Sequence, residues 1–394
     1  MSAADANAAA ANSRGMAALR EGRFDDAATA FRAAIAVDPS SGALLRNLAS
    51  ALRAQGSEDE ELAALDGALS LDRRDMVAWI RKAEIHQRKA ENGPALEAWH
   101  AALALAEPLR PWSGPLAAAL ATGEAFQAKA VSAITDAVGA EVGYLAGDLD
   151  ETERRRSTAF VDLALGRRRI YVNECAGLYY PFLPADEFFD DRHFPWFAEL
   201  ASATGSIRSE LEALLRDPGA ALRPYVRMEA GTPDSHWTPL DQSLDWGACF
   251  LWEYGEPNRK VIERCPRTAE VIAAIPGTTI PGRAPNAFFS LLRPKTRIPP
   301  HTGVTNTRAI VHLPLIVPEG CGFRVGGETR PWIEGQPLAF DDTIEHEAWN
   351  ESDSLRAVLI LDCWNPHLTE AERQIITRYF AAADSAGYNP RREE

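Results

Sequence analysis

The chain has 394 residues, of which 46% are hydrophobic and 25% are charged, as in ordinary soluble globular proteins. Its formal net charge of −15 argues against a nucleic-acid partner and against an anionic membrane surface, because both require a basic protein face. No stretch approaches the ~20 apolar residues of a membrane span, and five scattered cysteines argue against a disulfide framework or a structural zinc site. We therefore expect a reduced, cytoplasmic protein of two or three domains.

The N-terminal residues 1–12 are rich in alanine and lack the basic start and leucine-rich core of a secretory signal. We expect them to form a short disordered tail.

Residues 13–108 repeat with a period of 34 residues. Large apolar residues recur at this spacing and are followed, three positions later, by alanines: Phe31, Leu65 and Trp99, then Ala34, Ala68 and Ala102. The pattern resembles the tetratricopeptide repeat, in which small residues let paired helices approach and aromatic residues fill the gap to the next pair. The second unit departs from the motif, with Glu61 where a small residue belongs. A generic alanine-rich bundle is the alternative.

The repeats predict an α-helical solenoid that holds a peptide or partner protein. Residues 109–147, with a helical pattern over 115–140, are expected to supply capping and linker helices.

From residue 148 onward, clusters of arginine, aromatic residues and proline replace the alanine-rich pattern, and β-strand signals dominate after Trp237. Thr369 and Glu372 are spaced as a capping box for a terminal helix over 369–386. Short runs of Val, Ile, Leu and Phe predict six strands: Ala287–Leu292, Thr307–Val317, Cys321–Val325, Pro337–Phe340, Glu345–Trp349 and Leu355–Cys363. Strands this short and dense suggest a sandwich or a double-stranded β-helix of the jelly-roll kind. The fold class is therefore multidomain α + β.

Alternate residues of a strand share a face, so Arg308, Ile310 and His312 are expected to point the same way. This face would form a polar barrel interior.

Four segments carry a specific resemblance: "HTGVTNTRAIVHLPL", "CGFRVGGETRPW", "FDDTIEHEAW" and "RAVLILDCWNPHLTEAER". In this order and spacing they resemble the aspartyl/asparaginyl β-hydroxylase family of iron(II)/2-oxoglutarate oxygenases. The resemblance covers roughly 244–373 and is weaker back to residue 179. It implies that residues 148–394 form a cupin-like oxygenase domain, with a β-helix core at about 244–366.

The resemblance also implies roles for individual residues. His301 and His346 would bind Fe(II), leaving coordination positions for 2-oxoglutarate and O2. Arg356 would hold the distal carboxylate of 2-oxoglutarate through its planar, charged fork. Further contacts to this cosubstrate are implied for three residues: His312, Ser290 and Trp246.

Most enzymes of this chemistry carry a carboxylate two residues after the first histidine, where this chain has Gly303. The β-hydroxylase family shares this gap, and Asp342 is a candidate to hydrogen-bond a metal-bound water. Each residue also has a structural alternative: a turn residue for His301, a core histidine for His312, an ion pair for Arg356 and a turn for Asp342.

The implied reaction is hydroxylation of a C–H bond, with an aspartyl or asparaginyl residue of a peptide or protein as substrate. In protein-hydroxylating members two arginines on one strand hold the target carboxylate; here the two positions are Arg308 and Ile310. Aspartate is therefore expected to be a poorer substrate. The alternatives are a hydroxylase of a free amino acid such as proline or of a lipid, and a repeat scaffold whose barrel has lost catalysis.

Overall fold

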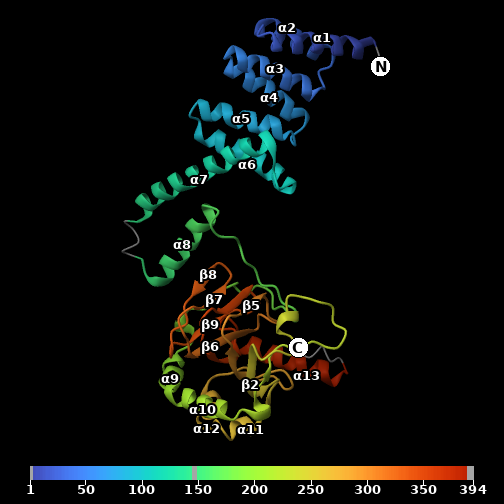
Figure 1. The fold of residues 1–394 in the computed structure, drawn as a ribbon. Helices are drawn as coiled ribbons and strands as arrows, with labels where there is room; N and C mark the ends of the chain where they lie inside the picture. The colour runs from blue at the N-terminus through green and yellow to red at the C-terminus, as the bar shows by residue number, and fades with distance from the viewer. Residues whose placement is uncertain (1–2, 144–148, 388–394) are drawn as a thin grey trace. The chain divides into compact units, whose positions relative to one another are not determined.

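A computed structural model describes residues 3–143 and 149–387 (Figure 1). The chain separates into two compact units, Met1–Arg154 and Arg155–Glu394. Within the described ranges, no helix combines the length and the apolar character needed to cross a membrane.

The first unit is α-helical. Consecutive helices pack against one another, so that helix pairs stack along the unit (Figure 1). In chain order the helices are α1 (Ala3–Arg20), α2 (Phe24–Val37), α3 (Gly42–Gln55), α4 (Glu58–Leu71), α5 (Met76–Arg88), α6 (Asn92–Ala106), the 3₁₀ turn η1 (Glu107–Leu109) and α7 (Gly114–Gly143).

The repeated apolar residues fill the interfaces between these helices. Phe31, Leu65 and Trp99 are all fully buried. A Cβ atom at Gly15 would lie 2.6 Å from the Phe31 ring, so this close helix crossing requires glycine. Helix α7 adds Leu120 to the cluster around Trp99, which closes the last repeat.

Glu61, the departure from the repeat motif, is fully buried and paired. Its two carboxylate oxygens lie 3.2 Å from Arg81 and 3.2 Å from Arg88. The carboxylate is tolerated in the stack because two guanidinium groups from helix α5 compensate its charge.

One expectation is corrected in this unit. Helix α1 begins at Ala3, so residues 3–12 lie in a helix and not in a disordered tail. Alanine has the highest helix propensity, and Ala11 is buried in a cluster with Ala34 and Leu44, which gives the segment a packing partner.

The second unit combines helices with two antiparallel sheets. Its helices are α8 (Glu151–Ala164), which crosses the boundary between the units, η2 (Asp191–His193), α9 (Phe197–Ser202), α10 (Thr204–Arg216), η3 (Gly219–Ala221), η4 (Thr238–Leu240), α11 (Arg259–Ile262), α12 (Pro266–Ala274) and α13 (Glu370–Ser385). Its strands are β1 (Arg223–Pro224), β2 (Trp246–Glu253), β3 (Glu256–Pro257), β4 (Ala287–Leu292), β5 (Thr296–His301), β6 (Arg308–Ile316), β7 (Cys321–Val325), β8 (Glu328–Arg330), β9 (Leu338–Phe340), β10 (His346–Asn350) and β11 (Arg356–Trp364).

The larger, seven-stranded sheet has the order β1-β2-β4-β11-β6-β9, with β3 pairing β2, and the four-stranded sheet has the order β5-β10-β7-β8. The two sheets share one hydrophobic cluster, which includes Leu292 and Val358 from the larger sheet and Ile298, Phe323 and Ala348 from the smaller. They therefore face each other across this interior.

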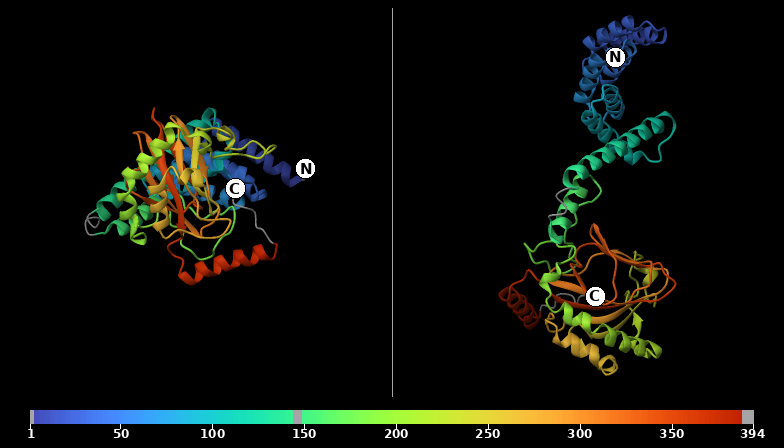
Figure 2. Two further views of the ribbon diagram at one scale, coloured as in Figure 1. Left: turned by 90° about the horizontal axis from the view of Figure 1, so that it is seen from below. Right: turned by 90° about the vertical axis from the view of Figure 1, so that its left-hand side faces the viewer.

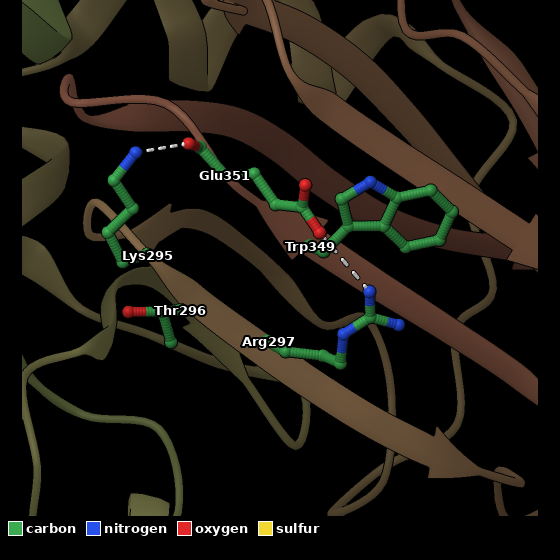
Figure 3. A pocket seen from close by; sticks show the side chains of 5 residues that line it. All are labelled: Lys295, Thr296, Arg297, Trp349 and Glu351. Carbon is green, nitrogen blue, oxygen red and sulfur yellow. Dashed lines mark hydrogen bonds and ion pairs between the residues drawn. The ribbon is translucent and has the colours of Figure 1, made fainter.

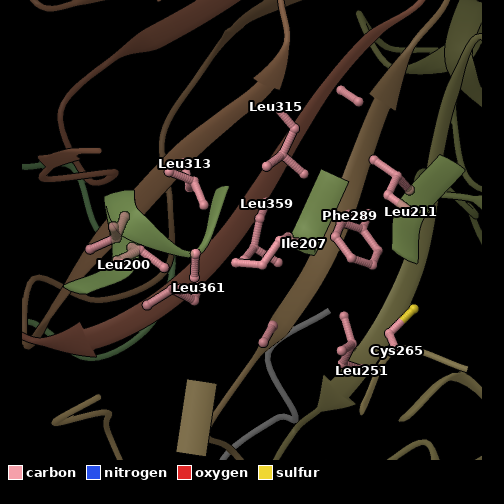
Figure 4. Close-up of a cluster of buried hydrophobic side chains, with 14 of the residues drawn as sticks. Leu200, Ile207, Leu211, Leu251, Cys265, Phe289, Leu313, Leu315, Leu359 and Leu361 are labelled. Atoms are coloured by element: carbon pink, nitrogen blue, oxygen red, sulfur yellow. The ribbon is translucent and has the colours of Figure 1, made fainter. Parts of the chain in front are cut away.

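Strand parity separates the two faces of the larger sheet. Ala357, Leu359 and Leu361 of β11 pack outward, under helices α9 to α12, whereas Val358 and Ile360 face the interior between the sheets. Figure 4 shows the outer cluster, with Ile207 of α10 beside Leu359.

All six predicted strands are present, with ends shifted by no more than one residue. Strand β5 was not predicted, because it contains Pro299 and Pro300. It lies at the edge of the smaller sheet, where missing backbone donors are tolerated.

Helix α13 begins with the predicted capping box between Thr369 and Glu372. Its buried Ile376 and Phe380 pack on Ile280 and Leu368, so the helix lies on the outside of the sheets (Figure 2).

Candidate metal and anion site

The two predicted metal ligands lie side by side. His301 ends β5 and His346 begins β10, and these residues are register partners across the antiparallel pair. Their ring centroids are 4.0 Å apart. Residues 45 positions apart in the chain are thus brought together by one strand pairing.

The tautomer of each imidazole is set by a backbone carbonyl. Nδ1 of His301 lies 2.8 Å from the Pro299 oxygen, and Nδ1 of His346 lies 3.0 Å from the Ile344 oxygen. A carbonyl only accepts, so each Nδ1 carries the proton and each Nε2 keeps its lone pair for a metal.

Burial keeps both rings neutral. It lowers the pKa of His301 to about 4 and the pKa of His346 well below its usual range, with the neighbouring His301 as a further cause. Neutral imidazole is the form that binds metal ions. Within the described ranges, no cluster of three or more His, Cys, Asp and Glu side chains is arranged to hold a metal.

A carboxylate occupies the space beside Gly303. A Cβ atom at this glycine would lie 2.1 Å from Oδ2 of Asp342, so a side chain at position 303 would displace this carboxylate. The neighbouring Asp341 closes the turn, because its Oδ1 accepts from the backbone N–H and the hydroxyl of Thr343 at 3.0 and 2.6 Å. The two aspartates thus differ: Asp341 closes a turn, and the Asp342 carboxylate lies in the space that a side chain at position 303 would need.

Arg356 is buried without a carboxylate partner among the described residues. It is 2% exposed, its Nε has no hydrogen-bond acceptor, and its Nη1 lies 3.3 Å from Oγ of Ser290. Burial lowers its pKa to about 10, so the guanidinium is still charged at neutral pH. Trp246 donates its indole N–H to the same hydroxyl at 3.1 Å. A buried cation with no counter-ion favours an anionic ligand.

His312 lies on the same side of the interior. It is 5% exposed and its Nδ1 has no hydrogen-bond partner. Burial, followed by the charge of Arg356, lowers its pKa well below the usual range. It is therefore a neutral histidine with an unsatisfied ring nitrogen, unlike a satisfied core residue.

Arg308 and Ile310 lie on β6, four and two residues before His312. Ile310 packs into the interior cluster, as strand parity predicts. Arg308, however, is paired: its Nη1 lies 2.9 Å from Oδ2 of Asp362, and both side chains are buried. The cation at this end of the strand is therefore compensated within the protein.

Three residues of this region were missed in the sequence. The Trp237 ring lies 5.0 Å from that of His301, and Trp332 lies 4.4 Å from the guanidinium carbon of Arg356 with its own indole N–H unsatisfied. No sequence signal distinguishes these tryptophans from core residues. Asp362, in contrast, is six residues after Arg356 on β11, and strand parity alone would have placed it on the interior face.

A surface pocket lies at the opposite end of the same strands (Figure 3). It is lined by Lys295, Thr296, Arg297, Trp349 and Glu351. Both of its cations already have ion-pair partners: Lys295 lies 3.0 Å from the Asp353 carboxylate, and Arg297 lies 2.9 Å from that of Glu347 and 3.5 Å from that of Glu351. It contains none of the predicted site residues.

Comparisons with known proteins find relatives of both units. A model of the aspartyl/asparaginyl β-hydroxylase family matches residues 202–366, and a tetratricopeptide-repeat model matches residues 12–75. Human aspartyl/asparaginyl β-hydroxylase is 34% identical over 188 residues, which are 46% of this chain and 24% of the human protein. The ornithine lipid ester-linked acyl 2-hydroxylase of Rhizobium tropici is 34% identical over 197 residues, 49% of this chain and 66% of that protein.

Among solved structures, the tetratricopeptide domain of Sgt2 from Aspergillus fumigatus is similar to 31% of this chain and 80% of its own, at 21% identity and a TM-score of 0.28. The chain spans about a quarter of the length of the human hydroxylase that it matches.

The β-sheet unit thus contains the region that is similar to the hydroxylases, and the helical unit contains the tetratricopeptide-repeat match. Residues 202–366 form a domain that matches the aspartyl/asparaginyl β-hydroxylase family, and tetratricopeptide repeats precede this domain in the chain.

Proposed function

We propose that this protein is an iron(II)- and 2-oxoglutarate-dependent oxygenase that hydroxylates a C–H bond. The observation that carries the proposal is the pair of neutral, carbonyl-oriented imidazoles, His301 and His346, in the same interior as the uncompensated Arg356. A metal and an anion are the two ligands that this combination fits.

The topology supports a double-stranded β-helix for this unit. From β4 to β7 the chain alternates between the larger and the smaller sheet, and β9, β10 and β11 continue the alternation. This alternation between two facing antiparallel sheets is typical of a jelly roll.

Each residue has a defined task in the proposed site. His301 and His346 would hold Fe(II), which together with 2-oxoglutarate and O2 supplies the oxidising chemistry. Arg356 would bind the distal carboxylate of 2-oxoglutarate, with the Ser290 hydroxyl beside it and Trp246 fixing that hydroxyl. The unsatisfied Nδ1 of His312 is a further contact for the cosubstrate.

Asp342 would act from outside the metal-ligand set. Its carboxylate fills the space at Gly303, the position that holds the third ligand in most enzymes of this chemistry. We assign Asp342 to hydrogen-bonding a metal-bound water. It would orient this water without itself binding the metal.

The proposed substrate is an aspartyl or asparaginyl side chain of a peptide or protein, recruited by the repeats. Arg308 is neutralised by Asp362 and the next interior position is Ile310, so a carboxylate finds less positive charge there than two arginines would supply. This favours the uncharged asparaginyl group. The same apolar residue supports a second candidate, an acyl chain, because a relative named as a lipid acyl 2-hydroxylase shares this domain.

The test is turnover on matched substrates. Two peptides that differ only by Asp or Asn, and an ornithine lipid, would be incubated with enzyme, iron and 2-oxoglutarate, and +16 products measured by mass spectrometry. We expect succinate formation and faster hydroxylation of the Asn peptide than of the Asp peptide. Absence of both iron binding and succinate formation would instead indicate a repeat scaffold with an inactive barrel.

Ile310→Arg provides the matched variant for substrate choice. The added cation should improve turnover of the Asp peptide by about tenfold or more, the value of one charge-assisted hydrogen bond. Efficient hydroxylation of the Asp peptide by the wild type, with no gain in Ile310→Arg, would refute this account of the pocket.

A further inference from the structure

An extended segment, residues 168–180, runs through the second unit before the first residue of the β-hydroxylase match. We call it the strap. It contains no helix or strand, yet residues 170–175 alternate between exposed and partly buried, as in a strand. In this stretch Ile170 and Val172 are exposed, and Tyr171, Asn173 and Cys175 are partly buried.

The strap hydrogen-bonds to both loops that carry the predicted metal ligands. Its Ala176 and Gly177 N–H groups donate to the carbonyls of Gly303 and Val304, at 3.1 and 2.9 Å, just after His301. Its Glu174 N–H donates to the carbonyl of Thr343 at 2.7 Å, just before His346. A single segment therefore joins the two loops through backbone hydrogen bonds.

Asn173 makes the side-chain contacts of the strap to the turn before His346. Its Nδ2 donates to Oδ2 of Asp341 at 2.7 Å and to Oγ1 of Thr343 at 3.0 Å. Asp341 is fully buried, and its other oxygen is bonded to Thr343. The amide of Asn173 thus satisfies the second oxygen of this buried carboxylate.

The turn that Asn173 holds determines where two groups of the site lie. Asp342 follows Asp341 directly, and its backbone carbonyl accepts from the Gly303 N–H at 2.6 Å. His346 follows the turn and is held by the Ile344 carbonyl. A shift of this turn would move Asp342 and His346 relative to His301.

We propose that Asn173 is a positioning residue for the two-histidine site, because it fixes the Asp341–Thr343 turn against the strap. The inference rests on the proposed metal centre. It assigns a role in that centre to a residue that lies outside the matched family region.

The test measures metal binding by the full-length protein, with Co(II) as the probe. Asn173→Ala should bind Co(II) about 10- to 100-fold more weakly than the wild type, the usual effect of losing a residue that orients a metal ligand. The visible absorption of bound Co(II) should also change, because this spectrum reports ligand geometry and does not depend on turnover.

Tyr180→Phe is the matched control. It removes another strap hydrogen bond, from the Tyr180 hydroxyl to Glu372 at 3.1 Å, which leads to helix α13 and not to the ligand loops. This variant should keep the wild-type Co(II) affinity and spectrum. Circular dichroism would establish that each variant is folded.

Thr343→Val is a second probe of the same contact, for use if Asn173→Ala does not fold. It removes the hydroxyl that accepts from Asn173 and donates to Asp341, and should therefore also weaken Co(II) binding. Wild-type affinity and spectrum in a folded Asn173→Ala or Thr343→Val protein would overturn the role of Asn173 and leave the metal centre intact. Failure of the wild type to bind Co(II) would overturn the metal centre, and the positioning role with it.

Discussion

The two units differ in how completely their buried polar groups are hydrogen-bonded. In the first unit the buried ionisable side chains all have partners: Glu61 with two arginines, Asp75 with Arg46, and His86 with Glu91 at 2.6 Å. The buried side-chain atoms without a hydrogen-bond partner among the described residues all lie in the second unit. Three of these belong to residues around one interior site: His312, Trp332 and Arg356.

Paired and unpaired buried groups have different effects on stability and on ligand binding. A paired buried charge contributes to one arrangement of the helices, and breaking the pair leaves an uncompensated charge. An unpaired buried group lowers stability until a ligand satisfies it. The buried charges of the helical unit are thus compensated within the protein, whereas the interior of the second unit keeps polar groups that a ligand would satisfy.

The largest expected effect concerns the histidines. His301→Ala or His346→Ala should weaken Fe(II) or Co(II) binding by more than about a hundredfold and abolish succinate formation, because a ligand matters more than its orienting partner. His100→Ala, an exposed histidine of the first unit, is the control and should change neither quantity. Near-normal iron content in either ligand variant would show that the imidazoles are not the metal ligands.

The free energies of unfolding of two methionine variants, one in each unit, test this comparison directly. Arg81→Met leaves the fully buried Glu61 with Arg88 alone, and should lower the free energy of unfolding by about 3 kcal/mol. Arg356→Met removes a buried guanidinium that has no carboxylate partner, and should leave the stability of the ligand-free protein unchanged or higher. Urea unfolding measures both; a large loss in Arg356→Met would mean that this arginine is structural.

The affinity for 2-oxoglutarate provides the complementary measurement. Arg356→Ala should weaken 2-oxoglutarate binding by about thirtyfold, or ~2 kcal/mol, since it leaves a desolvated carboxylate without its partner. Titration of the Co(II)-loaded protein measures this affinity. An unchanged value would assign the anion to another group of the site.

The smallest effect is at two helix caps, one in each unit. Thr369→Ala removes a reciprocal capping box and should destabilise the second unit by about 1 kcal/mol. Ser41→Ala in the first unit should cost less, because the Ser41 hydroxyl accepts from Leu44 N–H at a long 3.5 Å. Thermal unfolding of the two variants would measure both losses of stability. A larger loss in Ser41→Ala than in Thr369→Ala would contradict the geometry of the two caps.

The sequence predicted those parts of the fold that depend on local patterns. The 34-residue period gave the helical repeats, and short apolar runs gave strands β4, β6, β7, β9, β10 and β11. It failed where local and tertiary preferences differ: prolines concealed β5, and alanine-rich residues 3–12 looked like a tail until packing partners were seen.

For the site, the family resemblance selected residues that the structure brings together, notably His301 with His346 and Arg356 with Ser290. The resemblance gave no indication that Asp362 neutralises Arg308, although strand parity places both side chains on the interior face. Nor could it identify Asn173, whose partner Asp341 is 168 residues away in the chain, because such a contact has no local signature.

The two prolines of β5 have a consequence for the behaviour of the protein in solution. An edge strand usually presents a row of backbone donors to which a strand of another molecule can add, the first step towards aggregation. Pro299 and Pro300 have no N–H groups, and because successive residues of a strand direct their N–H groups to opposite sides, one donor is missing from the open edge beside His301. A foreign strand therefore cannot form a continuous ladder along β5, and the margin of the sheet that carries His301 is protected from self-association.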